Sequence, residues 1–124
     1  MNELNQLTDR VIGACIKIHK NLGPGLLEST YQECLAYELT QAEIPFEKEK
    51  KLPIQYDNIF IEDAYRVDFI VNNSIIIELK SVEQLNSTHE AQTLTYLKLS
   101  KLPLALLINF KTKLLKDGIR RYAH

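Results

Sequence analysis

Apolar residues recur every three or four positions in two stretches of the first third of the chain, which is the spacing of one face of an α-helix. The first stretch contains Leu7, Val11, Cys15, Ile18 and Leu22, and the second contains Leu27, Tyr31, Cys34, Leu35 and Leu39. Gly23-Pro24-Gly25 separates them, and proline disfavours helical geometry in the residue before it. We therefore predict a helix over residues 7–22, starting near Thr8-Asp9, and a second helix that ends at about Ala42.

The middle of the chain has the patterns of β-strands. Residues 46–56 alternate charged and apolar side chains, which predicts a strand with one solvated face, and Pro53 places that strand at a sheet edge or at a bulge. Residues 65–71 and 74–80 are apolar runs on either side of Asn72-Asn73. Because asparagine tolerates left-handed backbone angles, the two runs predict a hairpin.

The last third of the chain predicts one more helix and one or two strands. Ser87 and Glu90 have the spacing of a helix start, with Ser87 as the cap. This helix is expected to run to about Ser100, with an inward face of Ala91, Leu94, Leu97 and the stem of Lys98. Residues 104–110 have the continuous apolar content of a strand covered on both sides, and residues 116–123 predict a shorter final strand. A helix between two strands permits a parallel crossover, so the order of elements predicts an α/β sandwich with a central mixed sheet flanked by helices.

The length and composition are those of one globular domain that spans residues 1–124. The chain has 124 residues, of which 45% are hydrophobic and 25% are charged. No apolar run reaches the length of a membrane span, so we expect no membrane association and a cytoplasmic location. Cys15 and Cys34 lie on the apolar stripes of the two predicted helices and are expected to be buried free thiols. Two such cysteines, without histidines at ligand spacing, do not form a zinc site.

The charge of the chain is small in total but unevenly distributed. The net charge of −1 argues against indiscriminate binding to polyanions, yet residues 85–124 contain seven Lys and Arg against two acidic residues, and residues 1–84 contain eight against fourteen. A basic C-terminal third suits a surface that holds the phosphates of a nucleic acid, and a solvated basic face explains the same charges equally well. Arg120 and Arg121 are the best candidates for phosphate contacts, although only one of them can face a given side of a strand.

Three charged residues, Asp68, Glu78 and Lys80, interrupt the apolar strands of the predicted hairpin. Burying a charge without a partner is costly, and two carboxylates that share a divalent cation would offset that cost. Glu78 and Lys80 share a face because side chains alternate along a strand. Asp68 joins them only if the hairpin loop has three residues, Asn72-Asn73-Ser74, or if a strand has a bulge, because a two-residue turn would turn Asp68 to the other face. The alternative is an ordinary cross-strand ion pair between Asp68 and Lys80.

These residues also resemble a known family. Asp68 followed by Glu78-Leu79-Lys80 resembles the acidic pair and lysine of the PD-(D/E)xK nuclease superfamily, and Gln92-x-x-x-Tyr96 resembles the additional motif of its RecB-type branch. Upstream, Gly25-x-x-Glu28-x-x-Tyr31 resembles the signature of the small GxxExxY family, which is assigned to the same superfamily. The resemblance continues through Tyr65-Arg66-Val67, His89, Leu107-Ile108-Asn109-Phe110 and Gly118-Ile119-Arg120-Arg121, so it covers most of the chain. It implies a restriction-endonuclease-like fold.

The resemblance also implies roles for individual residues. Asp68, Glu78 and Glu28 are expected to hold Mg²⁺, for which Mn²⁺ is a substitute, and Lys80 is expected to orient the attacking water or to stabilise charge on the phosphate. Gln92 and Tyr96 are expected to support this site and the substrate. In the upstream motif, Gly25 is expected to let the chain approach closely, and Tyr31 is expected to pack or hydrogen-bond nearby.

Several of these assignments have a simpler structural alternative. A carboxylate at the start of a helix, such as Glu28, is stabilised by the helix dipole without any catalytic role. Gln92 and Tyr96 are neighbours on one helical face, which also fits a helix–sheet packing pair. His89 is better interpreted as a capping or surface residue than as a catalytic one.

The function implied by the resemblance is that of a magnesium-dependent phosphodiesterase, a nuclease that cleaves nucleic acid by metal-assisted attack of water. The alternative is a non-catalytic module on the same fold that binds nucleic acid or protein. A nucleic acid is therefore the expected partner, and a protein partner or a second copy of the chain is a further expectation.

Overall fold

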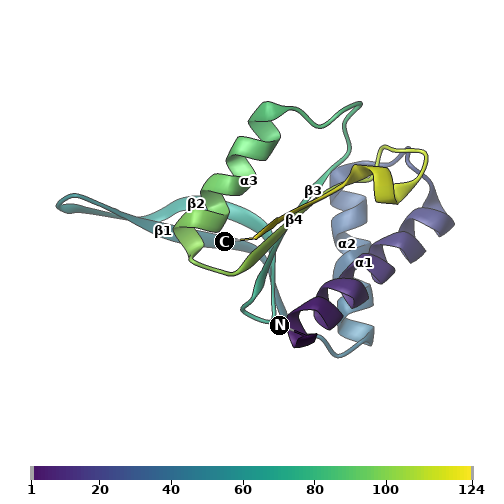
Figure 1. The fold of residues 1–124 in the computed structure, drawn as a ribbon, viewed down its shortest axis with the longest axis horizontal. Coiled ribbons are helices and arrows are strands. Elements are labelled where there is room, and N and C mark those ends of the chain that lie inside the picture. Colours follow the sequence, from purple (N-terminus) through teal and green to yellow (C-terminus); the bar gives the residue numbers. More distant parts are fainter. Residues whose placement is uncertain (1, 124) are drawn as a thin grey trace.

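One mixed five-stranded sheet carries helices on both of its faces in the computed structural model, which describes residues 2–123 (Figure 1). The elements in chain order are α1 (Asn2–Leu22), α2 (Glu28–Gln41), β1 (Phe46–Tyr56), β2 (Ile59–Val71), β3 (Ile75–Lys80), α3 (Ser87–Ser100), β4 (Leu104–Asn109), the 3₁₀ helix η1 (Leu115–Gly118) and β5 (Ile119–Ala123). The strands lie in sequence order, and only the β3–β4 pair is parallel. This arrangement confirms the predicted α/β sandwich and the crossover through α3.

A hydrophobic core lies on each side of the sheet. The larger core packs α1 and α2 against one face and includes Val11, Tyr31 and Leu35. The smaller core lies under α3 and includes Ile76, Leu97 and Ala105. All six residues of β4 are buried, which confirms that this strand is covered on both sides. Within residues 2–123, no helix is long and apolar enough to cross a membrane.

The first two helices differ from the prediction in detail. The first begins at Asn2, five residues before the predicted start, because Leu4 and Leu7 continue its packing against the larger core. Cys15 is buried, as predicted, and burial raises the pKa of its thiol to about 12. The prediction that Cys34 is buried was wrong, because this side chain is only partly covered at the rim of the same core.

The inward face of α3 also differs from the prediction. Thr93 and Leu97 are the buried residues of this helix, whereas Leu94 is 44% exposed and Ala91 and Lys98 face solvent. The actual cap is Asn86, whose side chain accepts a hydrogen bond from the backbone N–H of His89. His89 Nδ1 in turn accepts from the backbone N–H of Asn86, which confirms the capping interpretation of this histidine. The helix therefore starts one residue earlier than expected and is rotated relative to its apolar pattern.

Strand β2 changes the core that it faces partway along its length. Phe69 belongs to the core under α1 and α2, whereas Val67 belongs to the core under α3. The register of β1 with β2 places Glu49 opposite Asp68, and Glu49 has a left-handed φ of 52°. Such a conformation is unfavourable for a residue with a side chain, so the surrounding structure must hold it in place. Asp68 lies between Val67 and Phe69, at the point where β2 changes from facing one core to facing the other.

Pro53 marks a second irregularity in the same pair of strands. The register of β1 with β2 shifts between Leu52 and Ile54, and β1 is an edge strand. Both alternatives predicted for Pro53, an edge position and a bulge, are therefore confirmed.

Replacing Gly118 by alanine should destabilise the fold. A Cβ atom at this position would lie 2.3 Å from the backbone oxygen of Asn109, so the backbone would have to move. We expect Gly118→Ala to lower the free energy of unfolding by about 1–3 kcal/mol. The measurement is urea unfolding followed by circular dichroism.

Gly13→Ala is the matched control. Gly13 is exposed in the middle of α1, and a Cβ atom there would meet nothing within 4 Å. Because alanine is the better helix former, this variant should be more stable than wild type by about 0.5–1 kcal/mol. Equal effects of the two substitutions would contradict the close contact at Gly118.

Candidate active site

The loop between β2 and β3 has three residues, and this sets the position of the two central acidic residues. Val71 pairs with Ile75, so Asn72, Asn73 and Ser74 form the loop, and both asparagines adopt left-handed backbone angles. In this register Asp68 stands opposite Glu78. From the sequence, Asp68 could lie on the same face as Glu78 only with a three-residue loop or a bulge. The loop has three residues, so this requirement is met.

The two strands separate immediately beyond the Phe69–Ile77 pair, the last pair in their register. Past that pair, the carboxylates take the place of backbone partners. The N–H of Asp68 donates to Glu78 Oε2 at 2.7 Å, and the N–H of Leu79 donates to Asp68 Oδ2 at 2.8 Å. We call this place, with Asp68 and Glu78 facing each other across the separating strands, the fork. Each side chain is held by the opposite strand's backbone, so both carboxylates are fixed in position.

Two carboxylates at the fork repel each other in a poorly solvated place. Glu78 is only 6% exposed, and burial, followed by the negative charge of Asp68, raises its pKa to about 8. Burial is also the main cause that raises the pKa of Asp68. The positive charge of Lys80 lowers the pKa of both groups. The doubly ionised state of the two carboxylates is therefore unfavourable.

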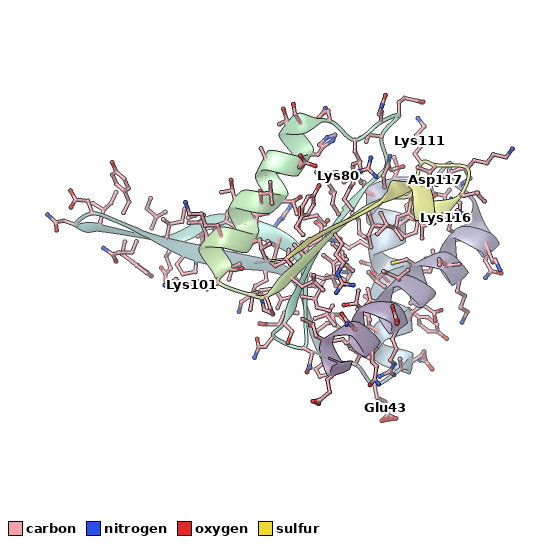
Figure 2. All side chains as sticks on the ribbon, viewed as in Figure 1. Glu43, Lys80, Lys101, Lys111, Lys116 and Asp117 are labelled. Atoms are coloured by element: carbon pink, nitrogen blue, oxygen red, sulfur yellow. The ribbon has the colours of Figure 1, made fainter. Side chains whose placement is uncertain are left out.

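Lys80 does not form a structural ion pair with the carboxylates. It lies at the carboxyl end of β3 (Figure 2), and its backbone oxygen accepts a hydrogen bond from Phe110 N–H at 2.8 Å. None of the ion pairs between described residues includes Asp68, Glu78 or Lys80. The alternative of an ordinary cross-strand ion pair between Asp68 and Lys80 is thus not what the structure contains.

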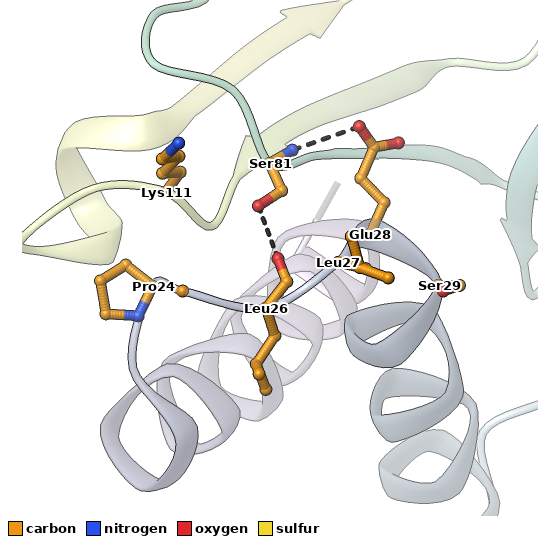
Figure 3. Close-up of a pocket in the computed structure, with 8 residues that line it drawn as sticks. Pro24, Leu26, Leu27, Glu28, Ser29, Ser81 and Lys111 are labelled. Carbon is orange, nitrogen blue, oxygen red and sulfur yellow. Dashed lines mark hydrogen bonds between the residues drawn. The ribbon is translucent and has the colours of Figure 1, made fainter.

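Glu28 approaches the fork from the start of α2. Its carboxylate accepts a hydrogen bond from the backbone N–H of Ser81 at 3.3 Å, and the hydroxyl of Ser81 donates to the backbone oxygen of Leu26 at 2.8 Å (Figure 3). The negative charge of Glu28 also raises the pKa of both Asp68 and Glu78. The chain just after Lys80 is therefore joined to the start of α2 by two hydrogen bonds.

Tyr31 holds the loop that leads to Glu28. Its buried side chain stacks on Phe110 with ring centroids 4.2 Å apart, and its hydroxyl donates to Gly23 O and accepts from Leu26 N–H. This confirms the expectation that Tyr31 packs and hydrogen-bonds nearby. The expectation for Gly25 was wrong, because a Cβ atom there would meet nothing within 4 Å and the chain does not approach it closely. The glycine with the unusual backbone is Gly23, with φ of 76° after the end of α1.

Asn109 fixes the chain on the other side of Ser81. This buried residue ends β4, and its side chain donates to Val82 O at 2.9 Å and accepts from Val82 N–H at 3.1 Å and from Lys111 N–H at 3.2 Å. The same side chain thus binds the segment after Lys80 and the segment that leads to Lys111. Asn109 was part of the family resemblance, but the sequence alone did not indicate this function for it.

The two residues of the helical motif on α3 have different surroundings. Tyr96 lies near the fork: after burial, the charges of Glu78 and Asp68 are the causes that raise its pKa, and its ring stacks on Tyr65 at 4.9 Å. Gln92 is exposed, and its side chain forms no hydrogen bond with another described residue. Tyr96 therefore combines both interpretations, since it packs against the sheet and approaches the carboxylates.

The two arginines of β5 point to opposite sides of the sheet. Arg120 pairs with Leu107, which pairs with Glu78, so the three lie in one row across β5, β4 and β3. Arg120 lines a hollow beside α3 together with Leu107 and Tyr122. Arg121 instead donates to Asn5 of α1 at 2.7 Å. The expectation that only one of them can face the site agrees with this geometry, and Arg120 is the one on the side of α3.

Two further residues act on Asp68 although neither of them was given a role from the sequence. Gln32 on α2 donates to Asp68 Oδ1 at 3.4 Å, and the charge of Arg66 lowers the pKa of Asp68. The signal for Gln32 was its position four residues after Glu28, which places both on one face of a helix. The guanidinium of Arg66 lies 3.7 Å from the carboxylate of Glu49, the residue with the left-handed backbone.

The residues of the fork fit a hard divalent cation by donor type and by charge. Carboxylate oxygens are the ligands that Mg²⁺ prefers, and the raised pKa values indicate negative charge that a cation would compensate. Across residues 2–123, however, no group of three or more His, Cys, Asp or Glu side chains is arranged to hold a metal ion. The expected convergence of three carboxylates is thus met only in part, because Asp68 and Glu78 face each other while Glu28 is bound to Ser81.

The five-stranded sheet, its flanking helices and this acidic pair with a lysine at a strand end define a restriction-endonuclease-like domain. The sequence profile of the PD-(D/E)XK nuclease superfamily matches residues 5–122, and the chain belongs to that superfamily. No curated protein and no solved structure matches the chain.

Replacing Glu78 by glutamine should stabilise the metal-free protein at and above neutral pH. The folded pKa of about 8 lies above the ordinary value of 4.5, so the folded state binds more protons than the unfolded state between these values. Stability from this group is therefore complete below about pH 4.5 and is lost as the pH rises through 8. The amide oxygen of Glu78→Gln can still accept from Asp68 N–H, so the variant should lose most of this decline.

The measurement is the melting temperature of wild type and of Glu78→Gln between pH 4.5 and 9, in buffers that contain a metal chelator. Glu83→Gln is the control, because Glu83 is an exposed carboxylate that pairs with Lys111 outside the fork, and it should keep the wild-type pH dependence. A strongly destabilised Glu78→Gln protein would mean that Glu78 is ionised and structurally paired in the folded state.

Proposed function

We propose that this protein is a divalent-metal-dependent phosphodiesterase that hydrolyses nucleic acid, and that it is a small member of the GxxExxY group of its superfamily. The observation that carries the proposal is the fork, where Asp68 and Glu78 are fixed opposite each other by backbone N–H groups and both have raised pKa values. Such an arrangement costs stability and is not needed for a sheet, so a function for it is the better explanation.

The residues of the fork can be given definite roles in this reaction. Asp68 and Glu78, with Glu28 as an additional carboxylate, would hold the cation, which would supply positive charge to polarise the phosphate and a bound water. Gln32 would keep Asp68 oriented through its hydrogen bond to Oδ1. Glu28, now bound to the backbone N–H of Ser81, would have to turn toward the cation to join Asp68 and Glu78.

Lys80 would act on the substrate and its water. A protonated ammonium has three donors and no lone pair, so Lys80 is suited to orient water or to stabilise negative charge on a phosphate oxygen. Its position two residues after Glu78 on β3, and its positive charge, which lowers the pKa of both carboxylates, support this role. The hydroxyl of Tyr96, near the same carboxylates, is suited to donate to a phosphate oxygen.

Cations around the fork support a polyanionic substrate. Arg66 lies beside Asp68, and Arg120 stands in the same row across the sheet as Glu78. On the other side of Glu28, Lys111 lines a hollow of about 500 Å³ that also includes Ser29 and Ser81 (Figure 3). A nucleic-acid strand that crosses the fork would therefore meet positive charge on both sides of the carboxylates.

One observation favours the second candidate function, a non-catalytic binding module on the same fold. Asp68 and Glu78 each use one oxygen to replace a backbone partner that the separating strands have lost. This is a structural use of the carboxylates, and it would be retained in a protein without activity. The module would bind nucleic acid or protein through the same surface and would not catalyse hydrolysis.

Lys80→Ala should separate the two candidates. We expect wild-type protein to cleave single-stranded or duplex DNA or RNA with Mg²⁺ or Mn²⁺, and we expect Lys80→Ala to bind the same substrate as tightly while its turnover falls by about 10²–10³-fold. The exposed Lys20 of α1 supplies the matched control, since Lys20→Ala removes a lysine outside the fork. Cleavage that persists undiminished in Lys80→Ala would reject the assigned role. Tight binding without cleavage by wild type would favour the module.

A further inference from the structure

The end of the β1–β2 hairpin projects away from the rest of the molecule. Beyond the irregularity at Pro53, residues 54–63 continue as a two-stranded ribbon, which we call the arm, with Ile54 paired to Ile61 and Tyr56 paired to Ile59. Figure 1 shows the arm as the extension at the left end of the long axis, away from all three α-helices. An isolated hairpin is at best marginally stable in water, so an arm of this kind is expected to pack against something.

The arm exposes large apolar side chains. The exposed fractions are 70% for Tyr56, 54% for Ile59, 62% for Phe60 and 43% for Ile61. Because side chains alternate along a strand, Tyr56, Ile59 and Ile61 share one face of the arm and Phe60 lies on the other. Both faces of the arm therefore expose apolar side chains, and exposed apolar surface of this kind marks an interaction surface. The solvent-exposed arm therefore needs a partner with an apolar surface.

The charge of the arm restricts what that partner can be. The segment 52–65 contains Asp57, Glu62 and Asp63 and has no lysine or arginine. A nucleic acid would be repelled by these carboxylates, so the arm is not a further part of a nucleic-acid surface. Its partner should combine apolar side chains with positive charge.

The opposite end of the same chain has this combination. Leu26, Leu27 and Leu114 are exposed there, together with Lys113 and Lys116, and we call these five residues the end surface. The segment that contains Leu114 is attached beside the end of α1 through a 2.8 Å hydrogen bond between His19 Nε2 and Thr112 O. Figure 2 shows Lys111 and Lys116 at the end of the molecule that lies farthest from the arm.

We propose that the arm binds the end surface of a second copy of this chain. The arm and the end surface lie at opposite ends of the long axis, so two copies placed side by side in opposite directions bring each arm to the other copy's end surface. The two contacts are equal and related by a twofold axis, and the dimer is closed. Complementary charge, three acidic residues of the arm against Lys113 and Lys116 of the end surface, sets the direction of the pairing.

Two other arrangements of the second copy fit the charges less well. Two arms packed against each other would bring together two sets of three carboxylates. The apolar groove between α1 and α2 is lined by Glu33 and Glu38, and its Lys17 is already paired with Glu38. Both arrangements would place the acidic arm against further negative charge.

The test reverses the charges of the arm and of the end surface, separately and together. Sedimentation equilibrium of the chain of residues 1–124 measures how strongly each variant dimerises. Wild type should form a dimer whose dissociation constant rises with salt. Reversing the arm by Glu62→Lys with Asp63→Lys, or reversing the end surface by Lys113→Glu with Lys116→Glu, should each weaken the dimer on the order of tenfold or more. All four substitutions in one chain should restore it, because both contacts then again pair opposite charges. Phe60→Ser should also weaken the dimer, and circular dichroism checks that each variant is folded.

Each other outcome would overturn the proposal. A wild-type chain that stays monomeric at high micromolar concentration does not use the arm in this way. Failure of the four-substitution chain to regain the dimer would mean that the arm and the end surface do not meet. Loss of the dimer in Tyr37→Ser, a change in the groove between α1 and α2, with no effect of the end-surface substitutions would place the arm in that groove.

Discussion

The structure depends on the position of two carboxylates that repel each other. Asp68 and Glu78 are held face to face because β2 and β3 separate at this point and each side chain accepts the N–H group of the opposite strand. Burial and their mutual charge make the doubly ionised pair unfavourable, which the pKa of about 8 for Glu78 expresses. A protein that only needed a sheet would gain stability by closing the ladder with apolar residues. The strain is therefore best understood as a binding site for positive charge.

The elements around the fork keep it in place. The three-residue loop sets the register, and the left-handed Glu49 of β1 lies opposite Asp68, where β2 changes the core that it faces. Tyr31 holds the loop before α2, so that Glu28 reaches Ser81, and Asn109 binds the residues that follow Lys80. These contacts come from three regions that are far apart in the sequence, and they explain why the family resemblance extends over most of the chain. Gly118 belongs to the same set, because its missing side chain leaves room for the backbone at Asn109.

The sequence predicted the helices, the strands, the parallel crossover and the conditions under which Asp68 and Glu78 face each other, because periodicity and the position of charges within apolar strands are local signals. The requirement for a loop of three residues followed from alternation along a strand and is met. The face of α3 was predicted wrongly, because Thr93 and Tyr96 are polar residues that face the sheet while the apolar Leu94 stays exposed. Gln32 was missed because its partner, Asp68, lies 36 residues away, and only the folded chain brings them together. The exposure of the arm could not be predicted from the sequence either, because an alternating pattern predicts a strand but does not show whether the apolar face of that strand is covered.

The most direct test of the account is isothermal titration of Mg²⁺ at pH 7 into wild type, Asp68→Asn and Glu83→Gln. Glu78, with a pKa of about 8, is largely protonated in the free protein and must ionise when the cation binds. The account predicts one site in wild type and in Glu83→Gln, with a heat that depends on the ionisation enthalpy of the buffer because close to one proton is released. Asp68→Asn should lose the site. Binding that is unchanged in Asp68→Asn, or a heat that is independent of the buffer, would contradict a metal site at the fork.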